Sequence, residues 1–253
     1  MNVKNLFFSG LLCFLFSFNS AKAQDILSQL KSDKDQNVIY SGQALGGAFL
    51  HSNGWGLFFE KAKILSIYRL WFWEIQTANM ESPQQIKIQN SAFPDAKGYF
   101  FGKLNSVQVF RFGTGLNKRL FRKNNLRCVE VDAVYSAGAS IAAAKPVWLE
   151  IIPANSELSP ISAPYNPVQD NPSNIYGGAS FFDGLGQMKF YPGGYAKFGL
   201  NFDYANKYNT LKEIETGIII DAYPQVIPIM AYVRNNQVFV NLYLSIGFGK
   251  RWY

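Results

Sequence analysis

The dominant feature of the chain is a repeated alternation of apolar and polar side chains. Within residues 195–204, Phe198 and Leu200 alternate with Lys197 and Asn201. A period of two places successive side chains on opposite faces of a β-strand. The pattern predicts long amphipathic strands with one apolar and one polar face. It recurs in residues 128–141, 212–222 and 237–248.

The length of these segments favours a membrane barrel. A tilted strand needs about 9 to 11 residues to cross a bilayer, whereas strands of soluble sheets average about 5 or 6. In a membrane barrel the apolar face meets lipid and the polar face fills the lumen. In a soluble periplasmic β-sandwich, the structural alternative, the apolar faces of two sheets meet each other.

Less regular strands are expected elsewhere, and Ser52-Asn53-Gly54 is expected to form a hairpin turn. The long connections 77–98 and 153–176 are expected to be extracellular loops or lumen plugs, and 179–185 a helical turn. We predict an all-β protein, a single antiparallel transmembrane β-barrel of about 8 to 10 strands, because closed bacterial barrels have even strand numbers. The additional strand candidates are residues 40–49, 55–64, 65–75, 106–114 and 147–152.

The first residues have the features of a secretory signal. Lys4 precedes an apolar run, residues 6–18, which is too short to span a bilayer, and Ala21-Lys22-Ala23 forms a cleavage site. A lipid-anchored Cys13 is the alternative, disfavoured because Leu11 and Leu12 precede it. The expected organisation is a signal peptide (1–23), an N-terminal periplasmic arm (24–37) and an outer-membrane barrel (38–253).

Composition supports this organisation. Aromatic and charged residues each make up 16% of the chain, whereas soluble domains carry about 25% charged residues. Removal of Lys4 and Lys22 leaves 22 basic and 17 acidic residues, a modest excess without the dense basic stripe that nucleic-acid binding requires. Cys128 would be the single mature cysteine, so an intrachain disulfide is excluded.

The closing segment, Ile246-Gly247-Phe248-Gly249-Lys250-Arg251-Trp252-Tyr253, resembles the terminal strands of many Bacteroidota outer-membrane barrels. Strict alternation places Tyr253 on the polar face, so a bulge near Gly249 is expected if its side chain faces lipid. Along its whole length the chain resembles an outer-membrane β-barrel family of the Bacteroidota to which we attach no activity, and no catalytic residue is carried over. The segments that carry this resemblance are the Ala-Lys-Ala-Gln cleavage region, residues 51–56, 102–105 and 145–150, and the terminal strand.

His51 is the single histidine, and it lies next to Ser52 at the expected turn, with Glu60 nearby in sequence. Outer-membrane lipid A hydrolases use a histidine, a serine and an acid, which motivates a catalytic hypothesis. Adjacent strand residues point to opposite faces, however, so we favour a structural turn with His51 at the membrane interface.

A group of charged residues is expected on the inward face: Glu130, Asp132, Glu150, Lys197, Asp203, Glu215 and Asp221. Paired charges that fill a polar lumen explain this group better than a catalytic carboxylate cluster. One histidine and one mature cysteine offer no zinc-type spacing, and Gly186, Gly193 and Gly194 do not form a phosphate-binding loop. The sequence therefore nominates no catalytic, cofactor-binding or metal-ligating residue and no cofactor.

A basic cluster surrounds Asn124-Asn125. It is expected to be a solvated turn, with lipopolysaccharide phosphates or a protein partner as the alternative ligands. Its members are Lys118, Arg119, Arg122, Lys123 and Arg127.

These features favour a non-enzymatic barrel in the cell outer membrane, a structural or accessory subunit of an envelope assembly or secretion complex. Its expected partners are outer-membrane lipid and lipopolysaccharide, together with other envelope proteins and no nucleic acid. The alternatives are a small channel or transporter and a lipid-modifying enzyme that uses His51.

Overall fold

The structure is a computed structural model that describes residues 40–123, 128–153, 159–207 and 209–253. The expected signal peptide and periplasmic arm lie outside the described residues. Within the described ranges no helix is long and apolar enough to cross a membrane.

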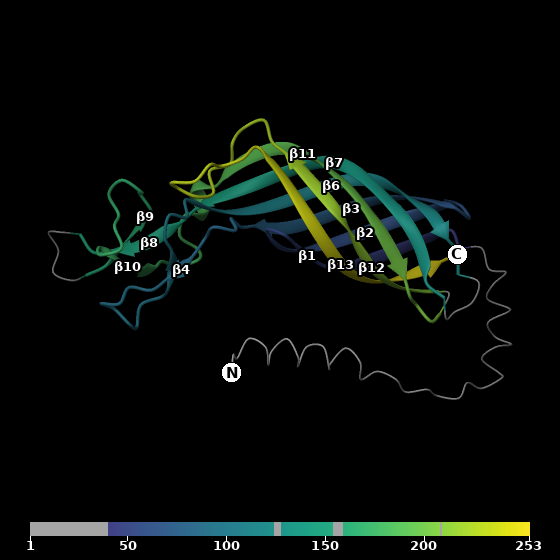
Figure 1. Ribbon diagram of the computed structural model, residues 1–253, viewed down its shortest axis with the longest axis horizontal. Helices are drawn as coiled ribbons and strands as arrows, with labels where there is room; N and C mark the ends of the chain where they lie inside the picture. The colour runs from purple at the N-terminus through teal and green to yellow at the C-terminus, as the bar shows by residue number, and fades with distance from the viewer. Residues whose placement is uncertain (1–39, 124–127, 154–158, 208) are drawn as a thin grey trace, which may run out of the picture. The chain divides into compact units, whose positions relative to one another are not determined.

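Eight strands close into a single antiparallel barrel (Figure 1). The first and last barrel strands pair over ten positions, from Gly42 opposite Trp252 to His51 opposite Tyr243. The prediction of an all-β barrel is therefore confirmed, with eight strands. The barrel strands are β1 (Gly42–His51), β2 (Gly54–Ser66), β3 (Arg69–Met80), β6 (Asn105–Phe121), β7 (Glu130–Pro146), β11 (Lys189–Asp203), β12 (Thr210–Ala222) and β13 (Val238–Trp252).

The side chains alternate as the sequence predicts. In β11, Phe198 and Leu200 are exposed on the outer wall, whereas Lys197 and Asn201 are buried in the lumen. The apolar outer face and polar interior are the inverse of a soluble sandwich and are the arrangement of a transmembrane β-barrel. Exposed apolar side chains of the outer wall include Leu50, Leu57, Phe59, Ile75, Phe110, Phe112, Leu116, Ile141, Ile218, Ile220, Val240, Leu242, Leu244, Ile246 and Phe248.

The two ends of the barrel differ in their connections. The turn end carries the short connections 67–68, 122–129 and 204–209, together with the start of β1 and the end of β13. The loop end carries the connections 81–104, 147–188 and 223–237 and the tight turn at residues 52–53. In that turn Gly54 has φ +150°, a value that favours glycine.

The two longest connections form an ordered structure, here called the loop module (the described residues of 81–104 and 147–188). Its elements are β4 (Lys87–Ile88), β5 (Tyr99–Phe100), β8 (Trp148–Ile151), β9 (Ile161–Pro164), β10 (Ile175–Gly178) and a 3₁₀ turn, η1 (Leu185–Gln187). Strand β8 lies between β9 and β10 in a three-stranded sheet, and β4 pairs with β5. The buried side chains of Tyr99, Leu149, Tyr165 and Ile175 form a separate apolar core. The apolar segment 147–152 therefore belongs to the loop module and not to the barrel, since its side chains pack against residues of the module.

Several expected boundaries were wrong. The boundary expected between strands 55–64 and 65–75 lies instead at a turn of residues 67–68, which separates β2 from β3, and β6 extends well beyond residue 114. Pairing of β13 with β1 continues through Gly249 without a shift, so the expected bulge is not formed there. Tyr253 lies beyond the last paired residue, Trp252, and is 75% exposed with its ring stacked on Tyr40. Because β1 offers it no pairing partner, alternation no longer governs its direction.

Candidate functional site

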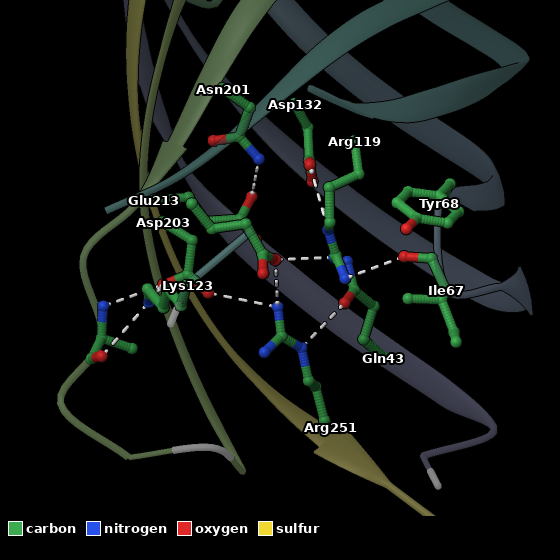
Figure 2. A network of polar contacts seen from close by, with 12 residues as sticks. Gln43, Ile67, Tyr68, Arg119, Lys123, Asp132, Asn201, Asp203, Glu213 and Arg251 are labelled. Atoms are coloured by element: carbon green, nitrogen blue, oxygen red, sulfur yellow. Dashed lines mark hydrogen bonds and ion pairs between the residues drawn. The ribbon is translucent and has the colours of Figure 1, made fainter. Parts of the chain in front are cut away.

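The lumen is the candidate site because it gathers the buried charges of eight strands. At the turn end, Arg119 contacts Glu130 at 2.6 Å and Asp132 at 3.3 Å. Arg251 contacts Glu130 at 3.4 Å and Asp203 at 3.1 Å. Figure 2 shows Arg119 and Arg251, from β6 and β13, pointing into this shared network of acids. Arg119 therefore links β6 to β7, and Arg251 links β13 to β7 and β11.

The same network includes groups from two turns. The Nζ atom of Lys123 lies 3.0 Å from the carboxylate of Asp203, and Arg119 donates to the carbonyl of Ile67 at 3.2 Å (Figure 2). In the expected basic cluster, Arg119 and Lys123 thus turn inward, whereas Lys118 and Arg122 are exposed; Arg127 lies outside the described residues. The prediction of one solvated turn was therefore wrong for two members, because the buried acids of the lumen attract their positive charges.

Glu74 is the centre of a second network, midway along the lumen. Its side chain is fully buried and accepts hydrogen bonds from Ser136 at 2.5 Å and Tyr195 at 2.7 Å. Lys197 lies 2.8 Å from Glu74 and 3.2 Å from Glu215. Lys197 therefore pairs with two carboxylates at once. This pairing offsets the free-energy cost of burying charged groups, which is large for a charge without a partner.

Two inward glycines make room for the tyrosines of this network. A Cβ atom on Gly113 would lie 2.2 Å from the hydroxyl of Tyr195, and one on Gly199 would lie 2.3 Å from that of Tyr243. The freed space lets Tyr243 donate to Glu215 at 2.5 Å. Each of these two tyrosines therefore packs against a glycine on another strand.

Near the loop end, Arg111 and Asp221 form a bidentate pair, with N–O distances of 2.7 and 2.8 Å. Beyond this pair the connection 223–237 caps the lumen with buried Ile227, Ile229 and Met230. Loop-end strand residues pack against these side chains, including Met80, Val107, Val109, Ala142, Ala144 and Phe239. The lumen plug therefore comes from 223–237, whereas the two longest connections form the loop module.

The cap is attached to the loop module through its backbone. The carbonyl of Ile229 accepts from the backbone N–H of Leu104 at 2.9 Å, and Ala231 donates to Gly102 at 2.7 Å. Lys103, between them, is 7% exposed, and its Nζ lies 4.8 Å from the centroid of the Phe100 ring. Burial lowers the pKa of Lys103, an effect that the negative charge of Glu81 opposes.

Little space remains inside the barrel. The lumen void lined by Lys197, Glu215, Phe49 and Tyr243 has a volume of about 10 Å³. A void of this size holds about one water molecule. This void therefore offers no room for a small-molecule substrate.

The charges of the lumen are unequal in number. The eight carboxylates of the barrel strands are all buried: Glu60, Glu74, Glu130, Asp132, Asp203, Glu213, Glu215 and Asp221. The opposing cations within the described residues are Arg111, Arg119, Lys123, Lys197 and Arg251. Glu60 makes no ion pair with a described residue, and Glu213 accepts a hydrogen bond from Asn201 at 2.5 Å. The lumen is therefore acid-rich, although most of its acids are paired.

His51 is held by the hairpin turn. Its Nδ1 accepts from the backbone N–H of Asn53 at 3.3 Å, so the proton resides on Nε2, which lies 3.1 Å from the carbonyl of Asn79. Ser52 Oγ accepts from the backbone N–H of Leu242 at 3.1 Å on another side of the turn. Glu60 lies six residues along β2 from the partner of His51, about 20 Å away. The structure therefore does not bring the three residues together.

The remaining sequence candidates have separate positions. Of the expected inward charges, all lie in the lumen except Glu150, which belongs to β8 of the loop module; the expectation for Glu150 was wrong because its strand is not part of the barrel. Cys128 is a free, exposed cysteine. Within the described ranges no three metal-binding side chains converge.

The sequence analysis did not identify Glu74, the centre of the second network, as a lumen residue. Glu74 lies in a segment dominated by Trp71, Phe72 and Trp73, where apolar residues hide the alternation. Arg111 and Glu213 were also missed, although each has the inward parity of its strand. The predicted segments 106–114 and 212–222 already contained Arg111 and Glu213, so applying the alternation to these positions would have placed both inside the barrel.

Comparisons with known proteins find similarity to solved structures at low sequence identity. No family model and no curated protein matches the chain. Among solved structures, Ail, the attachment invasion locus protein of Yersinia pestis, in complex with the heparin analogue sucrose octasulfate, has 10% identity and a TM-score of 0.39. That match covers 83% of this chain and 97% of Ail. Neisserial surface protein A has 10% identity and a TM-score of 0.38, with 83% and 96% covered.

Proposed function

We propose that the protein is a non-enzymatic barrel of the outer membrane that serves as a structural or accessory subunit of an envelope assembly. The filled lumen carries this proposal, since a void of about 10 Å³ leaves the outer wall and the loop module as the available surfaces. The resemblance to a Bacteroidota barrel family and the contact with outer-membrane lipid and lipopolysaccharide belong to the same proposal.

The loop module supports a role in protein contact. The module has an apolar core of its own, and Phe181 and Phe182 are each 74% exposed. An apolar cleft of about 310 Å³, lined in part by Ile86, Phe101 and Met230, lies between the module and the cap. Exposed apolar groups on a rigid support are typical of interaction surfaces.

Purification in mild detergent tests this role. We expect the tagged protein to recover other envelope proteins from outer membranes in fixed stoichiometry, measured by mass spectrometry. A Phe181→Ser/Phe182→Ser variant should lose them while its barrel still migrates as a folded species in unheated gels. Recovery of the barrel alone from wild-type membranes would contradict the accessory role.

The channel alternative predicts a different result. A capped and filled lumen should give no ohmic conductance when the purified protein is inserted into planar bilayers. Stepwise conductance that depends on the protein would overturn the closed-lumen proposal.

The enzyme alternative is tested through His51. Because both ring nitrogens contact backbone groups, His51→Ala should leave the lipid A composition of cells unchanged, as should deletion of the gene. A change in lipid A that wild-type protein reverses and His51→Ala does not would contradict the non-enzymatic role.

A further inference from the structure

The outer wall carries a basic collar at the turn end. Its six members project outward from β2, β3, β6, β12 and β13 and are exposed: Lys61, Lys63, Arg69, Lys118, Lys212 and Lys250. These five strands and β1 are neighbours in the barrel, so the collar covers a continuous arc of six strands. On β7 and β11, the outward positions at this end are apolar, as at Val131 and Phe202.

The collar contains no acids. All eight carboxylates of the barrel strands point into the lumen, and none of the ion pairs among described residues includes a collar residue. In a lipid bilayer these cations lie where the polar headgroups begin, because long basic side chains extend toward the interface.

Two collar residues, Arg69 and Lys118, repel each other. They lie directly opposite each other in the pairing of β3 with β6. Like charges at opposed positions destabilise a sheet. An anion placed between the two side chains would remove the repulsion.

A second group surrounds β1. Ala44 pairs with Lys61 on one side and Lys250 on the other, so the two lysines flank one small residue at a separation of about 10 Å between Cα atoms. The Nζ of Lys61 lies 6.0 Å from the centroid of the Trp252 ring, and Lys63 is opposite Gly42 in the next outward row. Flexible lysines at this spacing can direct their ammonium groups at one phosphate.

We propose that this collar binds the phosphate headgroups of anionic glycerophospholipids, with its principal site between Lys61, Lys63 and Lys250. Tryptophans of the same zone, Trp71 and Trp252, anchor the barrel at the headgroup level. The collar thereby selects the lipid that surrounds the turn end.

The choice of glycerophospholipid rests on the proposed outer-membrane location. Short turns of such barrels face the periplasm, whereas long loops face outward. The turn end is then surrounded by the inner leaflet, which consists of glycerophospholipid. Lipopolysaccharide phosphates would instead meet the loop end.

Tryptophan quenching by brominated lipids tests the site. The purified protein, with Trp55→Phe and Trp148→Phe, retains Trp71, Trp73 and Trp252 near the collar. In vesicles of phosphatidylcholine with phosphatidylglycerol, brominated phosphatidylglycerol should show an affinity about fivefold above that of brominated phosphatidylcholine. Lys61→Gln/Lys63→Gln/Lys250→Gln should reduce this ratio to about one, and added salt should weaken it.

The matched control removes three exposed lysines on the loop side, Lys87→Gln/Lys97→Gln/Lys189→Gln, and should preserve the preference. Equal affinity for the two lipids in the wild-type protein, or an unchanged preference in the collar variant, would overturn the headgroup site. Failure of the wild-type protein to insert into vesicles, judged by gel migration without heating, would instead overturn the proposed membrane location.

Discussion

The lumen and the outer wall are two faces of the same eight strands, and they treat charge in opposite ways. Lumen acids are buried and mostly joined to arginine or lysine, as Glu74 is to Lys197. Outer-wall charges at the turn end are basic, exposed and without a carboxylate partner among the described residues. Most lumen acids are therefore paired within the barrel, whereas the collar depends on what surrounds the barrel.

The largest expected effect comes from breaking the lumen network at its centre. Glu74→Ala leaves the ammonium group of Lys197 and the hydroxyl of Tyr195 without their main acceptor. Loss of one partner of a buried pair costs about 3 to 5 kcal/mol. Urea unfolding in detergent micelles should show this loss in the free energy of unfolding, and Glu74→Ala/Lys197→Met should recover part of it. A loss below about 1 kcal/mol would argue against a central role for Glu74.

A charge in the middle of the outer wall should have the next largest effect. Ile246 lies on the apolar face of β13, opposite Ala48 and Ile214. Ile246→Arg should destabilise the barrel in lipid vesicles by about 2 to 4 kcal/mol. Lys250→Arg, four residues along β13 in the collar, is the control and should leave the free energy of unfolding nearly unchanged. Equal effects at both positions would contradict the assignment of Ile246 to the apolar face of the outer wall and of Lys250 to the collar.

A smaller effect distinguishes lumen glycines from wall glycines. Gly113→Ala places a methyl group against the Tyr195 hydroxyl, and overpacking of this kind costs about 1 to 3 kcal/mol. Gly46→Ala on the outer wall meets its nearest atom at 3.7 Å and should be neutral. Thermal unfolding followed by gel migration compares the two variants. Similar unfolding temperatures would mean that lumen packing tolerates the added methyl group.

The smallest expected effect concerns Arg69 and Lys118. Lys118→Glu turns an opposed like-charge pair into an attractive one, which should stabilise the barrel by about 0.2 to 1 kcal/mol in zwitterionic micelles. Urea unfolding provides the measurement. In anionic vesicles the gain should shrink, because the introduced carboxylate would repel the headgroups that the lysine attracts. A gain of equal size in both media would indicate that headgroups do not contact the pair.

The sequence by itself determined the wall of the barrel. Alternation in β7, β11, β12 and β13 identified the strands and sorted their residues between the two faces, because neighbouring side chains on a strand point in opposite directions. Lys197, Glu215 and Asp221 were placed in the lumen for this reason. Where aromatic residues filled both faces, around Trp71 and Trp73, the pattern disappeared and Glu74 was missed.

The tertiary structure alone decided which residues meet. Pairing of β1 with β13 sets the strand number at eight and brings Lys61 and Lys250 to either side of Ala44. The assignment of 147–152 to the loop module and of 223–237 to the cap likewise depends on contacts between distant segments. Local periodicity determines the direction of a side chain, whereas its partner depends on strand order and register, which are properties of the closed barrel.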